Sequence, residues 1–333
     1  MTGSEAARAA GHEVRTGPVA ASGGLAAVTL TSPAGLSASF VPRAGMVGCA
    51  LTLDGQELLG LRGGMPAYLS SAKTFGIPLL APWANRLGPD TYRVAGQECT
   101  VAGVRGVHRD EHGTAIHGLL AGADDWRVIE ASAQADSARL AAQFRFDHDC
   151  AEFDAFPFPH LIDIVVELSE NELAVSTTVT PLSDVGVPVA FGWHPYFTVP
   201  GVPREQWLLS LPFSRRALLD ERNLPTGEVV DWTWTSGDGP RALGTDVLDD
   251  LFVDVEPGAR AELSGVDERG RGVRIAMVYT SGYSYGVAFA PAAEDVVAIE
   301  PMTAPTAPFS GEFGVIVAHE PYEAVFTVMA ERI

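Results

Sequence analysis

Two short stretches of the chain carry side chains that can exchange protons with a substrate. One is His194-Pro195-Tyr196-Phe197, and the other is Glu300-Pro301-Met302-Thr303. An imidazole can give a proton and a carboxylate can take one, so the two together suit acid/base chemistry on a neutral substrate.

The residues before His194 predict a β-strand that places it. Residues 187 to 192 read Val-Pro-Val-Ala-Phe-Gly, and alternation along a strand puts Gly192, His194 and Tyr196 on one face. Pro195 restricts His194 to an extended backbone. The alternative is a core histidine whose ring nitrogens bond to the backbone.

A second short apolar strand precedes Glu300. Residues 296 to 299 read Val-Val-Ala-Ile, so alternation sends Glu300 to the side of Val296 and Ala298, and we expect Pro301 to end the run. A carboxyl group in apolar surroundings has a raised pKa. The alternative is a structural carboxylate paired with an arginine.

The rest of the chain repeats the strand pattern with almost no helical periodicity. Short apolar runs broken by Gly, Pro, Asp and Asn occur at 25 to 30, 46 to 53, 139 to 146, 160 to 168, 172 to 180, 207 to 211, 273 to 279, 285 to 290 and 322 to 329. Strands without intervening helices favour an all-β, antiparallel sandwich. We expect a flexible tail over residues 1 to 24 and one domain over 25 to 333.

Composition narrows the partners and the compartment. A formal charge of -20 over 333 residues argues against nucleic acid and anionic membrane as partners. No window approaches 18 consecutive apolar residues, and no secretory leader is evident. Three widely spaced cysteines predict neither disulfides nor zinc. We therefore expect a cytoplasmic protein.

Three further segments gather polar groups. Residues 82 to 89 carry Asn85 and Arg86, whose guanidinium can donate to vicinal hydroxyls, and Trp83, which can pack on an apolar sugar face. The alternative is a surface arginine with a core tryptophan. Residues 108 to 118 contain three histidines, but their glycines oppose the helix that would gather them on a metal, so we single out only His117.

The third segment, residues 246 to 254, interleaves aspartates with apolar residues. Its spacing lacks the pattern of a calcium loop, and one aspartate can accept hydrogen bonds from substrate hydroxyls. The chain also lacks a phosphate loop, a nucleophile elbow and a dinucleotide fingerprint. These observations predict a site of His, Glu, Asp and Arg without cofactor or metal.

Taken in order, these segments resemble the aldose 1-epimerase (galactose mutarotase) family. The matching stretches are Asn85-Arg86-Leu87-Gly88, His117-Gly118, His194-Pro195-Tyr196-Phe197, Leu248-Asp249-Asp250-Leu251-Phe252 and Glu300-Pro301-Met302-Thr303. The resemblance runs from about residue 25 to the C-terminus. It implies a large antiparallel supersandwich that interconverts the α and β anomers of a free aldose.

The resemblance also implies a role for each residue. Glu300 is the general base at the anomeric hydroxyl, and His194 is the acid at the ring oxygen. Arg86, His117, Asn85 and Asp249 match positions that bind the sugar. We choose Asp249 over Asp250 because it lies three residues before Phe252, as in the family.

Alternatives of other kinds stay open. A hexose-phosphate 1-epimerase needs several arginines to bind the phosphate, for which Arg86, Arg105 and Arg109 are available. A sugar-binding or sensor protein keeps the sandwich without catalysis. In each case the partner is a small-molecule sugar, and we expect a monomer or a homodimer.

Overall fold

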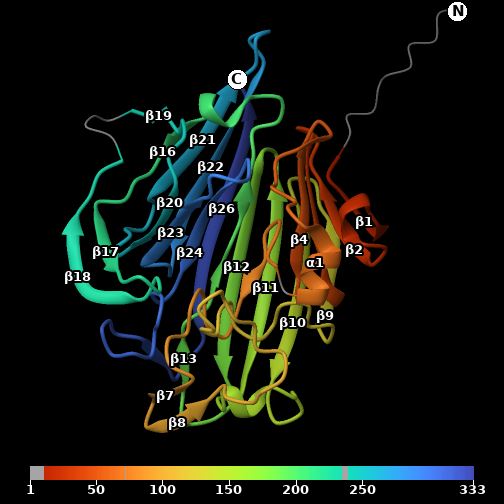
Figure 1. Cartoon of the computed structure of the whole chain (residues 1–333). Coiled ribbons are helices and arrows are strands. Elements are labelled where there is room, and N and C mark those ends of the chain that lie inside the picture. Colours follow the sequence, from red (N-terminus) through yellow and green to blue (C-terminus); the bar gives the residue numbers. More distant parts are fainter. Residues whose placement is uncertain (1–10, 72, 235–238) are drawn as a thin grey trace, which may run out of the picture.

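The computed structural model describes residues 11–71, 73–234 and 239–333. In this part of the chain the polypeptide is built mainly from antiparallel β-sheets (Figure 1). The all-β fold class predicted from the sequence is confirmed. Because strands alternate their side chains between two faces, each sheet offers one face to the core and the other to a further layer.

The largest sheet has nine strands, and its long members run side by side through the middle of the molecule (Figure 1). In spatial order they are β19 (Arg241–Ala242), β16 (Leu208–Ser210), β21 (Arg260–Val266), β22 (Gly272–Ser281), β26 (Tyr322–Arg332), β12 (Glu172–Pro181), β11 (His160–Ser169), β10 (Ala138–Phe146) and β9 (Arg127–Ala133).

The second sheet has eight strands and carries both proton-exchanging stretches. In spatial order they are β18 (Pro225–Asp231), β17 (Arg215–Leu219), β20 (Leu248–Phe252), β23 (Tyr285–Ala290), β24 (Val297–Met302), β14 (Gly192–Trp193) and β6 (Leu79–Leu80), while β15 (Tyr196–Phe197) also pairs with β24. The predicted strand at 187 to 192 is split, because its first part is β13 (Val187–Val189), which pairs with β25 (Ile316–Ala318). Pro301 does not end its strand, since β24 continues to Met302.

A five-stranded sheet at the N-terminal end consists of β1 (Glu13–Pro18), β2 (Ala26–Thr31), β3 (Leu36–Val41), β4 (Val47–Leu53) and β5 (Gln56–Glu57). The expected tail over residues 1 to 24 is therefore too long, because β1 pairs with β2 along its whole length. Residues 1–10 of that tail lie outside the described residues.

Smaller elements complete the fold. Strands β7 (Thr91–Val94) and β8 (Gln97–Thr100) form a hairpin, and the described residues also include the short 3-10 helices η1 (Ala20–Ser22), η2 (Pro42–Ala44), η3 (Phe153–Ala155) and η4 (Arg204–Gln206). One α-helix, α1 (Gly64–Ser71), was not expected from the sequence. No helix in the described ranges is long and apolar enough to cross a membrane.

The core lies between the nine- and eight-stranded sheets. The ring of Trp193 on β14 packs at 5.8 Å from Phe326 on β26, and that of Tyr279 on β22 packs at 5.8 Å from Phe213. Such buried aromatic pairs hold the two sheets face to face. The outer face of the eight-stranded sheet is then free to line a site.

Candidate functional site

Glu300 is placed on the outer face of the eight-stranded sheet by the alternation of β24. Val297 and Ile299 enter the large core, whereas Ala298 belongs to a separate small cluster on the opposite face. Glu300 follows the parity of Ala298. Behind it, the Tyr279 hydroxyl donates to the Glu300 carbonyl oxygen at 3.2 Å, which fixes the backbone from the core side.

His194 is placed in the same way from β14. The preceding Trp193 is fully buried, and its indole Nε1 donates to the Thr177 hydroxyl at 3.0 Å. The backbone N–H of His194 donates to the Pro78 carbonyl at 3.1 Å. With Trp193 in the core, the next side chain points to the outer face, as the sequence pattern predicts.

The two side chains meet in a cavity of about 320 Å³. His194 Nε2 lies 3.1 Å from Glu300 Oε1, and the side chains are only 7% and 2% exposed. Two of their polar atoms, His194 Nδ1 and Glu300 Oε2, have no hydrogen-bond partner among the described residues. Buried polar atoms without partners are rare in folded proteins, so Glu300 Oε2 suits a ligand or water in the cavity.

Burial acts on both pKa values in the direction that disfavours charge. Burial raises the pKa of Glu300 well above its ordinary value, and the negative charge of Asp249 adds to this while Arg86 opposes it. Burial lowers the pKa of His194 well below its ordinary value, and His117 and Arg62 add to that effect. Two buried groups so close together titrate as a pair, and both directions favour one proton on the pair.

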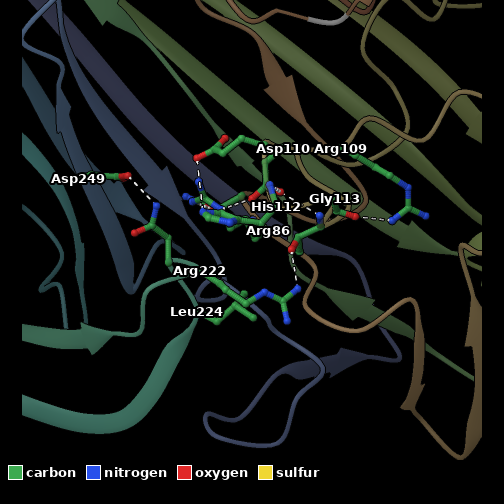
Figure 2. A network of polar contacts seen from close by, with 12 residues as sticks. Arg86, Arg109, Asp110, His112, Gly113, Arg222, Leu224 and Asp249 are labelled. Atoms are coloured by element: carbon green, nitrogen blue, oxygen red, sulfur yellow. Dashed lines mark hydrogen bonds and ion pairs between the residues drawn. The ribbon is translucent and has the colours of Figure 1, made fainter.

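Arg86 and Asn85 lie on one side of the cavity, in the loop that follows β6. Arg86 Nε donates to Asp110 Oδ2 at 2.6 Å, and both residues belong to the polar network drawn in Figure 2. The Asn85 side-chain oxygen accepts the backbone N–H of Arg86 at 2.7 Å. Asn85 has a φ of 52°, a left-handed conformation that asparagine adopts more readily than most residues.

His117 lies beside this loop, because its backbone N–H donates to the Asn85 carbonyl at 2.9 Å. Its ring makes an edge contact with the ring of His194, with centroids 5.5 Å apart. Burial, with the positive charge of Arg86, lowers the pKa of His117 to about 3. At neutral pH it is therefore an uncharged hydrogen-bonding group.

Asp249 and Asp250 are separated by the alternation of β20. Asp249 lies opposite Phe289 of β23 and lines the cavity, and its side chain is exposed. Asp250 points to the other face and accepts a hydrogen bond from Arg216 Nη1 at 3.0 Å. Of the two aspartates, only Asp249 is placed to reach a bound molecule in this cavity.

Other residues singled out in the sequence lie elsewhere. Trp83 is fully buried in the large core, so of its two alternatives the core tryptophan is confirmed and the stacking on a sugar face is not. His108 and Arg109 line a neighbouring cavity of about 630 Å³, which shares part of its wall with the first. No group of three or more His, Cys, Asp or Glu able to hold a metal occurs in the described ranges.

The sequence reasoning missed several cavity residues, among them Arg62, Thr74 and Phe289. Phe289 lies on β23 opposite Asp249, so strand alternation could have indicated it. Arg62 lies in the turn before α1 and Thr74 in the segment after it, and neither belongs to a periodic pattern or a motif. Only the folded chain brings them to the site.

The arrangement combines a proton-exchanging pair with groups that bind hydroxyls. Glu300 and His194 are close enough to act on neighbouring atoms of one molecule. Arg86 offers guanidinium donors and Asp249 offers carboxylate acceptors on the same cavity wall. A small polyhydroxylated molecule matches this set.

Comparisons with known proteins match this chain to one family over most of its length. A sequence model of the family described as aldose 1-epimerase matches residues 26–327. The uncharacterized protein YihR of Escherichia coli (strain K12) is 30% identical over 149 residues, which cover 44% of this chain and 44% of that protein. The aligned part is thus less than half the length of that curated relative.

Solved structures share the fold at low sequence identity. A galactose mutarotase-like protein from Clostridium acetobutylicum has a TM-score of 0.81 at 19% identity, with 96% of this chain and 99% of that chain covered. Galactose 1-epimerase from Lactobacillus acidophilus NCFM has a TM-score of 0.73 at 15% identity, with 96% and 98% covered. The galactose mutarotase-like sandwich predicted from the sequence is confirmed.

Proposed function

Because the chain belongs to the aldose 1-epimerase family, we propose that it interconverts the α and β anomers of a free aldose such as glucose or galactose. The observation that carries the proposal is the buried Glu300–His194 pair, 3.1 Å apart on a cavity wall. Anomer exchange needs one base and one acid at neighbouring oxygens of the same ring.

In the free protein the pKa shifts place the single proton of the pair on Glu300, and the reaction starts once that proton has moved to His194. The Glu300 carboxylate removes the proton of the anomeric hydroxyl, while His194 gives its proton to the ring oxygen. The C1–O5 bond breaks and the aldehyde forms, and the pair again holds one proton, now on Glu300. Rotation about the C1–C2 bond and the reverse transfers close the ring with the other configuration.

The remaining polar residues hold the sugar. Arg86 and the neutral His117 donate to ring hydroxyls, Asn85 contributes its amide, and Asp249 accepts. These contacts keep the anomeric carbon beside Glu300 and His194 while the open chain rotates. The steps are proton transfers, so the proposal calls for no cofactor.

The charges around the site favour a neutral aldose over a sugar phosphate. The arginines that line the two cavities are each paired with a carboxylate: Arg62 with Glu294 at 2.7 Å, Arg86 with Asp110 at 2.6 Å and Arg109 with Asp90 at 2.7 Å. A phosphate dianion would compete with these carboxylates for the guanidinium donors. Competition of glucose 6-phosphate against glucose tests this point, and a preference for the phosphate would contradict it.

Polarimetry on freshly dissolved α-glucose and α-galactose tests the proposed reaction. The wild-type protein should accelerate the approach to anomeric equilibrium above the spontaneous rate. Glu300→Gln and His194→Asn should each lose roughly 10²- to 10⁴-fold in rate while remaining folded, since each removes one proton-transfer group. Full activity in either variant would sink the assigned roles.

A matched calorimetric titration separates catalysis from binding alone. Sugar binding by the wild type without any acceleration would indicate a non-catalytic sugar-binding protein. Arg216→Gln serves as the control variant, because Arg216 bonds to Asp250 and does not line the cavity. It should keep the wild-type rate.

A further inference from the structure

His194 lacks the contact that orients most catalytic histidines. In such residues the ring nitrogen away from the reaction bonds to a carboxylate or a carbonyl, which fixes the tautomer and the ring plane. Here Nε2 faces Glu300, and Nδ1 has no hydrogen-bond partner among the described residues. Another group must therefore hold the imidazole.

Tyr196 contacts His194 both through its ring and through its hydroxyl. The two rings stack with centroids 4.2 Å apart and an interplanar angle of 16°. The Tyr196 oxygen lies 3.0 Å from His194 Nε2, the nitrogen that faces Glu300. His117 and Phe289 make edge contacts with the same imidazole, so the ring is enclosed.

The Tyr196 hydroxyl is itself held from two sides. Arg62 Nη1 donates to it at 2.9 Å, and the Thr74 hydroxyl lies 2.7 Å away. Arg62 is anchored in turn by Glu294, with Nε–Oε2 at 2.7 Å and Nη2–Oε1 at 2.8 Å. Arg62 also has a φ of 43°, an uncommon left-handed backbone that the surrounding structure must maintain.

The backbone around Tyr196 is equally restrained. Its N–H donates to the Gly76 carbonyl at 2.9 Å, and its carbonyl accepts the N–H of Gly60 at 2.9 Å. The segments before and after α1 are thereby joined to β15. This explains how Arg62 and Thr74, which are far from Tyr196 in the sequence, both reach the Tyr196 hydroxyl.

A count of hydrogens shows that the network tolerates both states of His194. A phenol has one hydrogen to donate and lone pairs to accept. With Arg62 donating, the Tyr196 oxygen can share the one hydrogen of a protonated Nε2 with the sugar's ring oxygen while giving its own hydrogen to Thr74. When Nε2 has lost its proton, Thr74 donates to Tyr196 and Tyr196 donates to Nε2, without movement of any heavy atom.

We propose that Tyr196, held by Arg62 and Thr74, is the positioning residue that orients His194 and keeps Nε2 hydrogen-bonded before and after proton transfer. The inference rests on the proposed function, because it assigns a role in the same reaction. Tyr196 contacts the acid His194 through its hydroxyl and its ring, so it acts through His194.

Tyr196→Phe keeps the stacked ring and removes only the hydroxyl. We expect kcat to fall about 10- to 100-fold with KM changed less than about threefold, because the acid loses its orientation but the sugar contacts remain. Thr74→Val should also lower kcat. Thr74→Ser, which keeps a hydroxyl at this position, should retain most of the wild-type kcat.

A matched control removes a different buried phenol hydroxyl. Tyr92 donates to the Ala155 carbonyl at 2.6 Å and does not line the cavity. Tyr92→Phe should change thermal stability without lowering kcat. If it lowered kcat as much as Tyr196→Phe does, the effect would be a general loss of packing and the proposal would be overturned.

Nitrogen-15 NMR of labelled histidines tests the inference without any turnover. The His194 signals, assigned with His194→Asn, should report one dominant protonation state in the wild type and a changed or averaged one in Tyr196→Phe. Unchanged His194 signals, or a Tyr196→Phe kcat within twofold of wild type, would overturn the proposal. A wild type without mutarotase activity would contradict the proposed function alone, because the spectra need no substrate.

Discussion

At the scale of single residues, the chemistry depends on one proton shared by Glu300 and His194. Burial raises the pKa of Glu300 and lowers that of His194. A second proton therefore binds only below the ordinary range of histidine, and the last proton leaves only above the ordinary range of glutamate. Between these limits the pair carries one proton, the number that ring opening requires.

This sharing predicts a bell-shaped pH profile of kcat/KM with a broad plateau. The acid limb should lie below pH 6.5, because the pKa of His194 is lowered from that value, and activity should fall again at high pH as the pair loses its proton. Initial rates by polarimetry from pH 4 to 10, with the spontaneous rate subtracted, give the profile. An acid limb above pH 7 would contradict the one-proton state.

The adjacent aspartates give a second test at this scale. Asp249→Asn should raise KM about tenfold with a smaller change in kcat, because a carboxylate acceptor facing the cavity is lost. Asp250→Asn is the matched control, and it should leave KM near the wild-type value because Asp250 faces Arg216. Equal effects of the two variants would show that the strand alternation does not separate their roles.

How far the site could be predicted differs from residue to residue. His194 and Glu300 follow strand alternation, which is a local property of the sequence, so their common face was predictable. Asp249 was chosen over Asp250 from the family pattern. The contact of Asp250 with Arg216, which separates the two aspartates, appears only in the folded structure. Arg62 and Thr74 depend on how the turns around α1 pack, which no local pattern encodes.

At the scale of elements, the turn between β17 and β18 reaches the site. Asp220 Oδ1 accepts the backbone N–H groups of Arg222 at 2.8 Å and Leu224 at 2.9 Å, which closes the turn. Arg222 Nη2 then donates to the Thr114 hydroxyl at 3.1 Å, and Asn223 Nδ2 donates to Asp249 Oδ2 at 3.3 Å. Figure 2 shows Arg222 and Asp249 in this network.

The turn predicts a role for Asn223 in substrate affinity. Asn223→Gly removes the amide but accepts the φ of 57° found at this position, whereas Asn223→Ala removes the amide and strains the backbone. Both should raise KM about threefold to tenfold with kcat nearly unchanged, because Asp249 loses its partner. Calorimetric titration with the sugar checks this, and wild-type affinity in Asn223→Gly would exclude a side-chain role.

Element boundaries show where local sequence information ends. Regular strands such as β10, β11 and β12 match the predicted runs closely, since each alternates over nine or ten residues. The run at 187 to 192 breaks because its two ends pair with different partners, β25 and β24. The short helix α1 has no strong apolar stripe, so periodicity could not predict it.

At the scale of the whole molecule, the large core carries a titratable group of its own. His160 opens β11 and is only 2% exposed. Its Nδ1 contacts the Phe158 carbonyl at 2.7 Å, and its ring packs 5.2 Å from that of Phe146. Burial lowers the pKa of His160 from 6.5 to about 4, so the folded protein holds it neutral.

This burial predicts a loss of stability in mild acid. Between pH 6.5 and 4 the unfolded chain binds a proton at His160 that the folded chain does not, so the free energy of unfolding falls as pH falls. From this pKa shift, we expect His160 alone to lower the free energy of unfolding by about 2 kcal/mol between pH 7.5 and pH 5.0. Urea unfolding at the two pH values measures this loss of stability. In His160→Gln the loss should be smaller by about 2 kcal/mol, even if the variant is less stable than wild type at both pH values.

His319→Gln is the control, because it removes an exposed histidine, and it should show the same loss as wild type. If His160→Gln also lost as much stability as wild type, His160 would not be the cause of the acid sensitivity.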